Sequence, residues 1–154
     1  MLITVTVNGV EYTREVEPRM QAADFLRDEL QLTGTHVGCE QGVCGSCTII
    51  VNGQTARSCI MFAPQLDGAD VLTVEGLADG SAMHPIQEAF RDCHGLQCGF
   101  CTPGFLLAVH ELLSEVSSPA DDEIREALSG NLCRCTGYEG IVEAVKLADV
   151  RWVR

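Results

Sequence analysis

Cysteines are the residues of this chain best suited to chemistry, with nine among 154 residues. The first cysteine set consists of Cys39, Cys44, Cys47 and Cys59. Its spacing, C-x4-C-x2-C-x11-C, falls within the plant-type pattern in which four thiolates hold a [2Fe-2S] cluster. Three ligands would come from one tightly bent loop containing Gly38, Gly42 and Gly45, and the fourth from a neighbouring strand. A four-thiolate zinc site is the alternative, but structural zinc usually shows two C-x2-4-C pairs.

A second cysteine set lies further along the chain and consists of Cys98, Cys101, Cys133 and Cys135. It combines C-x2-C in LQCGFCTPG with C-x-C in NLCRCTGY. The intervening residues suffice for two helices and a turn, which would bring the two pairs together. Thiolates at helix N-termini are favoured by the partial positive charge there. The spacing alone leaves three interpretations open: a second [2Fe-2S] cluster, a zinc site, or redox-active thiols.

The residues around the first cysteine set have the pattern of strands and turns. Alternating apolar residues follow the N-terminus, and Asn8-Gly9 predicts a hairpin turn, as Asn52-Gly53 does later. A short helix is predicted over residues 21–30, with one apolar face made of Ala22, Phe25, Leu26 and Leu30. A last strand is expected near Val71. Together these elements predict a small mixed sheet curled over one helix.

The residues around the second cysteine set have helical periodicity instead. The first helix is predicted to begin at Pro85 and to stop near Gly95, and the second is predicted to follow Pro103. The third is predicted from a Ser118 N-cap, with Pro119 at the first helical position, to Gly130, and the fourth from about Gly140. The apolar stripes of the first two are Ile86, Ala89, Phe90 and Cys93, then Phe105, Val109, Leu112 and Val116. Four helices in two hairpins are expected. The chain is therefore predicted to be α+β, with domains at 1–77 and 78–154.

Composition narrows the partners and the compartment. The formal net charge of -12 argues against nucleic acid, whose phosphates need Lys and Arg. The N-terminus has no signal-like h-region, and no apolar run approaches the length of a membrane span. We therefore expect a cytoplasmic protein, in which cysteine clusters more often indicate metal or redox chemistry than disulfides.

LQCGFCTPG and NLCRCTGY, together with the earlier GCEQGVCGSCT, resemble the small iron-sulfur subunits of the xanthine oxidase family of molybdenum hydroxylases. This family includes the small subunits of carbon monoxide dehydrogenases and the iron-sulfur domains of aldehyde and xanthine oxidoreductases. The motifs occur in the family's order, and the resemblance covers essentially the whole chain. Ser46, where relatives often have Ala, is a small departure.

The resemblance implies a β-grasp ferredoxin domain followed by an all-α four-helix domain, each with one [2Fe-2S] cluster. It implies that Cys98, Cys101, Cys133 and Cys135 hold the second cluster, and that Gln97 and Cys135 contact the molybdopterin. The molybdopterin and FAD would belong to a large and a medium partner subunit, in a heterotrimer or a dimer of heterotrimers.

An electron-relay subunit with no catalytic residue of its own is the function that the resemblance implies. A free two-cluster ferredoxin-type carrier is the alternative, although a free carrier has no need of the second motif. A zinc-stabilised interaction protein is a third hypothesis. The substrate is not predicted, because in this family the large subunit contacts it.

Overall fold

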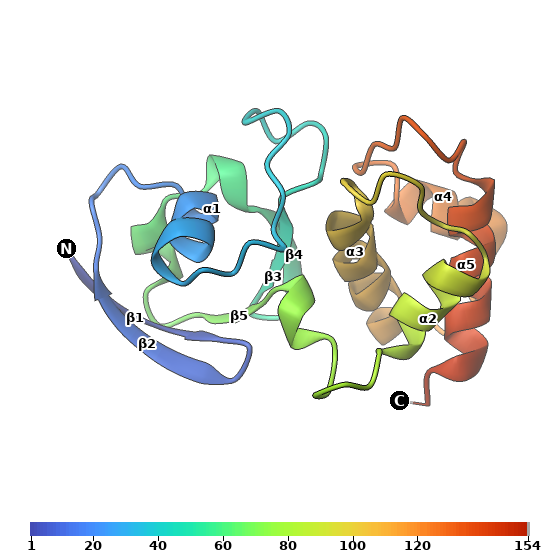
Figure 1. Cartoon of the computed structure of the whole chain (residues 1–154), viewed down its shortest axis with the longest axis horizontal. Helices are drawn as coiled ribbons and strands as arrows, with labels where there is room; N and C mark the ends of the chain where they lie inside the picture. Colours follow the sequence, from blue (N-terminus) through green and yellow to red (C-terminus); the bar gives the residue numbers. More distant parts are fainter. Residues whose placement is uncertain (154) are drawn as a thin grey trace.

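A computed structural model describes residues 1–153, in which a sheet-containing half and a helical half lie side by side (Figure 1). The strands are β1 (Leu2–Val7), β2 (Val10–Glu15), β3 (Thr48–Val51), β4 (Gln54–Arg57) and β5 (Asp70–Leu72). The main helices of the second half are α2 (Pro85–Asp92), α3 (Thr102–Glu115), α4 (Asp121–Ala127) and α5 (Glu139–Arg151). The α+β class is confirmed. The boundary after residue 77 stays a prediction, and Arg154 lies outside the described residues.

The strands form one mixed sheet in the order β2-β1-β5-β3-β4. The hairpins β1–β2 and β3–β4 are antiparallel, whereas β1 and β5 run parallel. Both predicted turns are confirmed: Asn8 and Gly9 have φ angles of 51° and 78°, and Asn52 and Gly53 have 51° and 85°. Positive φ at both central residues is what a type I′ hairpin turn requires, and Asn-Gly adopts it readily.

The predicted helix over residues 21–30 forms, but most of it is wider than an α-helix. After one short α-helical segment, α1 (Ala22–Asp24), the chain continues as the π-helical turn η1 (Phe25–Glu29). The N–H of Leu30 donates to the carbonyl of Phe25 at 3.1 Å, five residues back. The Phe25 and Leu26 side chains are fully buried in the core beneath the sheet. The apolar face of this helix was therefore predicted correctly, whereas the α-helical hydrogen-bond pattern was not.

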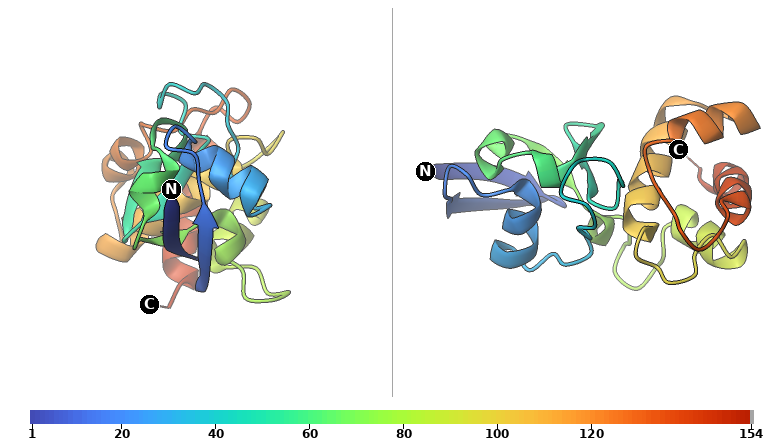
Figure 2. Two further views of the ribbon diagram at one scale, coloured as in Figure 1. Left: turned by 90° about the vertical axis from the view of Figure 1, so that its left-hand side faces the viewer. Right: turned by 90° about the horizontal axis from the view of Figure 1, so that it is seen from above.

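Strand β3 contributes side chains to two cores. Ile49 packs into the core of the sheet-containing half, while Ile50 points the other way and packs with the helices. Leu72, Val74 and Leu77 also pack against the helical core. Helix α3 contacts both β3 and β4 and lies nearest the sheet (Figures 1 and 2). The two halves thus share apolar contacts across their junction.

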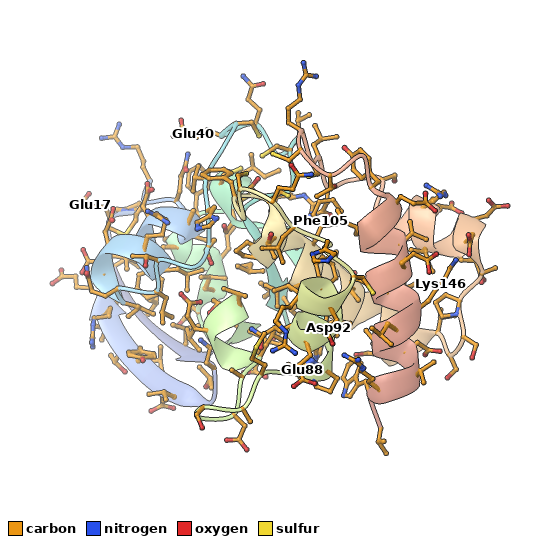
Figure 3. All side chains as sticks on the ribbon, turned by 45° about the vertical axis from the view of Figure 1, so that its right-hand side comes forward. Glu17, Glu40, Glu88, Asp92, Phe105 and Lys146 are labelled. Atoms are coloured by element: carbon orange, nitrogen blue, oxygen red, sulfur yellow. The ribbon has the colours of Figure 1, made fainter. Side chains whose placement is uncertain are left out.

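The closest pairing in the helical half is between its first and last helices, α2 and α5. Asp92, labelled in Figure 3, accepts from Arg151 of α5 at 2.7 Å and from Arg91 at 2.9 Å. Both guanidiniums hold the pKa of the Asp92 carboxyl below its ordinary value. The expectation of two separate helical hairpins is therefore wrong, because α2 packs mainly on α5 rather than on its successor α3.

Two predicted helix ends are also corrected. Helix α4 begins at Asp121 rather than at Pro119, since the side chain of Glu123 accepts the N–H of Ala120 at 2.8 Å and caps the helix there. Ser118 lies outside the helix with a φ of 53°. Helix α2 ends before Gly95: His94 takes the left-handed conformation, with φ 54°, and Gly95 donates to the Phe90 carbonyl.

Two histidines and a tryptophan cluster where the C-terminal end of α5 meets α2 and α3. The His84 and His110 rings each lie 4.9 Å from the Trp152 ring, centroid to centroid. Burial lowers the pKa of His84, and burial together with the neighbouring His84 lowers that of His110. Both rings are therefore neutral in the folded chain near pH 7. No helix within residues 1–153 is long and apolar enough to cross a membrane.

This cluster predicts a pH dependence of stability. Below the ordinary histidine pKa of about 6.5, the unfolded chain takes up protons that the folded cluster resists, so the free energy of unfolding falls with falling pH. We expect His110→Phe to lose less stability than the unchanged chain between about pH 7.5 and about pH 6. Urea denaturation across this range measures the difference. His94→Asn, which removes an exposed histidine, is the control and should lose as much stability over this pH range as the unchanged chain. A His110→Phe chain that also loses as much stability as the unchanged chain would contradict the prediction.

Candidate iron-sulfur centres

The first cysteine set is assembled from one loop and the end of an adjacent hairpin. Cys39, Cys44 and Cys47 lie on the loop between η1 and β3, and Cys59 lies in the turn after β4. The hydroxyl of Ser58 donates to the Cys47 carbonyl at 2.7 Å, which ties the two ends of the hairpin together. Three cysteines from one loop and a fourth from beside a strand is the arrangement that the spacing predicts.

Hydrogen bonds and burial act differently on the sulfurs of this set. The backbone N–H groups of Cys44 and Gln41 each donate to the Cys39 sulfur at 3.4 Å, and they lower its pKa to about 6. Burial, with the neighbouring Cys47 thiol, raises the pKa of Cys59 to about 11. The N–H groups at Cys39 favour the thiolate form, which is the form that binds iron. At Cys59, where burial favours the neutral thiol, the positive charge of a bound metal would favour the thiolate.

The second cysteine set lies on two loops of the helical half. Cys98 and Cys101 precede α3, and Cys133 and Cys135 lie between α4 and α5. The Cys135 and Cys98 sulfurs are 3.6 Å apart, and the Cys101 thiol lies beside that of Cys133. The structure thus brings together two pairs that are separated in the sequence. Cys101 is also the N-cap of α3, as the argument from helix N-termini predicts.

Thr136 and Tyr138 support the loop that carries Cys133. Burial opposes ionisation of the Cys133 thiol, but the Thr136 hydroxyl at 3.1 Å and its N–H at 3.4 Å donate to the sulfur, and the pKa is lowered. The Cys133 N–H donates to the Tyr138 hydroxyl at 2.9 Å. Burial, with the neighbouring Cys133 thiol, raises the pKa of Cys101 to about 12.

The chemistry of both donor sets suits [2Fe-2S] clusters. Each offers four thiols, and in each at least one sulfur accepts backbone N–H groups, which stabilise cluster thiolates and tune their potential. Within the described part of the chain, no three His, Cys, Asp or Glu side chains gather closely enough to hold a single metal ion.

The two ligand loops touch each other directly. The N–H of Leu132, which precedes Cys133, donates to the Cys44 carbonyl at 2.9 Å. A second bridge runs from the His36 ring, whose Nδ1 lies 2.7 Å from the Phe100 carbonyl and whose plane stacks on the Phe100 ring. Both loops project on the same side of the molecule (the upper side of Figure 1).

The remaining residues singled out from the sequence take different places. Gln97 is exposed beside Cys98, and Cys135 is exposed as well, so both side chains are open to a partner. Cys93 lies half-buried at the end of α2, against the helical core and apart from both cysteine sets, where burial raises the pKa of its thiol.

Sequence reasoning missed the residues that join the ligand loops. No motif marked Arg57 or His36, and the NLCRCTGY motif, which begins at Asn131, did not indicate the role of that residue, because the partners of all three lie tens of residues away along the chain. The neighbours of the second set were within reach, since Thr136 and Tyr138 both belong to the NLCRCTGY motif.

Two family models match the chain in succession. The model described as "2Fe-2S iron-sulfur cluster binding domain" matches residues 5–78, and the one described as "[2Fe-2S] binding domain" matches residues 73–146. The chain therefore carries two [2Fe-2S]-binding domains, and the α+β order of a ferredoxin-like sheet domain followed by a helical domain is confirmed.

Relatives of similar length extend this match. The chain is 54% identical over 148 residues to the gamma subunit of caffeine dehydrogenase from Pseudomonas sp. (strain CBB1), covering 94% of this chain and 89% of that protein. It is 56% identical over 143 residues to the small subunit of nicotine 6-hydroxylase from Paenarthrobacter nicotinovorans, covering 93% and 86%.

A solved structure agrees with both relatives. The crystal structure of quinoline 2-oxidoreductase from Pseudomonas putida 86 contains a chain with a TM-score of 0.95 to this one, at 50% identity over 97% of this chain and 94% of that one. Matching domains, relatives and fold together agree with the resemblance of the sequence motifs. The chain belongs to the small [2Fe-2S] subunits of the molybdenum hydroxylases, the family of xanthine dehydrogenase and aldehyde oxidoreductase.

Proposed function

We propose that this chain relays electrons from a molybdopterin centre on a large partner subunit to FAD on a medium partner subunit. In this proposal Cys39, Cys44, Cys47 and Cys59 hold one [2Fe-2S] cluster, and Cys98, Cys101, Cys133 and Cys135 hold the other. Each cluster, when bound, accepts and releases one electron at a time. The observation that carries the proposal is the direct contact between the two ligand loops through Leu132 and Cys44.

Within this arrangement the protein's own groups hold and tune the sulfurs. The N–H groups of Gln41 and Cys44 stabilise negative charge on Cys39, and Thr136 does the same for Cys133. Hydrogen bonds of this kind, together with burial, set reduction potentials. No side chain of this subunit is assigned a catalytic role.

Exposed side chains around the ligand loops support docking between partner subunits. Gln97 and Cys135 are exposed at the second set, and we propose that they contact the molybdopterin. Large apolar side chains also face outward near the loops: Val43, Ile60, Phe100 and Leu132 are each about half exposed or more. Exposed apolar groups gathered around a site are typical of protein interfaces. We propose a cytoplasmic heterotrimer, or a dimer of heterotrimers, as the assembly.

Purification of the complex from its native host tests the proposal. Metal analysis and EPR of the dithionite-reduced sample should give two distinguishable [2Fe-2S] signals, with a molybdenum subunit and a flavin subunit co-purifying. A chain that purifies alone with both clusters would support a free carrier instead. A chain with one cluster, or with zinc alone, would refute the relay.

A further inference from the structure

A polar network with a buried centre joins the two halves of the chain. We call it the junction network, and its members are Gly45, Thr48, Arg57, Gly130 and Asn131. Asn131 is at its centre, with only 3% of its surface exposed. Its Nδ2 donates to the Gly45 carbonyl at 3.0 Å and to the Thr48 hydroxyl at 3.3 Å. Asn131 belongs to the helical half and both acceptors belong to the sheet-containing half.

Arg57 also forms a hydrogen bond between the two halves, but here the donor belongs to the sheet-containing half. One guanidinium nitrogen donates to the Thr48 hydroxyl at 2.8 Å, within its own half, and the other donates to the Gly130 carbonyl at 2.8 Å. The Thr48 hydroxyl in turn donates to the Gly45 carbonyl at 2.6 Å. The part made by Gly45, Thr48 and Asn131 is buried, whereas the contact of Arg57 with Gly130 lies at the exposed edge. Buried hydrogen-bonded networks make a contact more rigid.

The junction network lies immediately beside ligands of both cysteine sets. Gly45 follows Cys44, and Asn131 lies two residues before Cys133. The space between the loops is filled: a Cβ on Gly45 would collide with the Gly130 carbonyl, and one on Gly104 of α3 would collide with the Gly45 carbonyl. Backbone from the two halves is thus in contact at the place where the ligands of the two sets approach.

We propose that Asn131 and Arg57 are positioning residues that fix the separation and orientation of the two cluster-binding loops. This inference rests on the proposed function, since it assigns a role to the geometry between two occupied centres. The transfer concerned is a one-electron step: one centre loses the electron that the other gains, with no bond broken and no proton moved. Its rate depends on the separation of the centres, which the junction network holds constant.

The test uses the full chain, loaded with clusters and reduced with dithionite, and reads the spin-spin splitting between the two EPR signals. Asn131→Leu keeps a side chain of similar size but loses both donated hydrogen bonds, and Arg57→Gln loses the bridge to Gly130. We expect each variant to retain its iron and both signals, but to lose the resolved splitting. A change in geometry alters this splitting, whereas a loss of stability alone does not.

Two controls make the result decisive. Ile86→Val trims the helical core on α2, which contributes no member of the junction network, and Arg14→Gln removes an exposed arginine of the sheet; both should keep the splitting. If Asn131→Leu does not load its clusters, Arg57→Gln alone decides. Splitting that survives in the loaded variants overturns the inference and leaves the relay standing. An unchanged chain that lacks two signals overturns the relay itself.

Discussion

Replacing Cys135 by serine is expected to remove or strongly disturb the EPR signal of the second cluster while leaving that of the first largely intact. The Cys135 sulfur lies 3.6 Å from that of Cys98, so it is placed to complete the second donor set. A hydroxyl is a harder and far less acidic ligand than a thiol, and iron-sulfur clusters select soft thiolates. Iron content should fall to about half, because one of two equal clusters is lost.

Two matched variants assign the signals. Cys44→Ser should remove the other signal, because Cys44 lies in the first cysteine set, and Cys93→Ser should remove neither, because Cys93 lies apart from both sets. Low-temperature EPR and iron analysis of the three purified variants measure the effect. If Cys135→Ser and Cys44→Ser disturb the same signal, the proposed division of ligands is wrong.

Gly104→Ala is expected to destabilise the chain, although alanine is normally the better helix former. Gly104 lies in the first turn of α3, where its missing Cβ leaves room for the Gly45 carbonyl. Since that carbonyl is backbone and is held by Thr48 and Asn131, it cannot move aside easily. Overpacking should outweigh the gain of up to about 1 kcal/mol in helix propensity and leave a net loss of about 1–2 kcal/mol.

Urea denaturation of the full chain measures this loss. Ser114→Ala is the matched control, since it adds alanine to the same helix at an exposed position. It should leave the free energy of unfolding nearly unchanged. A Gly104→Ala chain more stable than the unchanged one would show that the two halves do not meet as closely as we describe.

Local signals predicted most of the elements. The Asn-Gly turns place both hairpins because those two residues accept positive φ angles at little cost, and helical periodicity locates all four main helices. Short spacing likewise indicates the first cysteine set, since three of its members share one loop. Both candidate sets come together in the structure as the spacing predicts, and the ligand assignment itself stays a prediction.

Two helix ends and the contacts between distant parts of the chain could not be predicted in the same way. Ser118 is of a residue type that predicts an N-cap, but Glu123 caps α4 from within the helix, and His94 rather than a glycine takes the left-handed position after α2. Tertiary contacts produce no periodic pattern in the sequence. The packing of α2 on α5 is one such contact, and the hydrogen bond from Asn131 to Gly45, across 86 residues, is another.

Strand β3 has a consequence for how this subunit can be divided. Because Ile49 serves one core and Ile50 the other, the sheet-containing half would lose the cover over one face if it were produced alone. The subunit should therefore melt in one cooperative transition rather than two. A chimera with a different ferredoxin domain would need to keep Ile50, Leu72 and Leu77, because these side chains pack with the helical core.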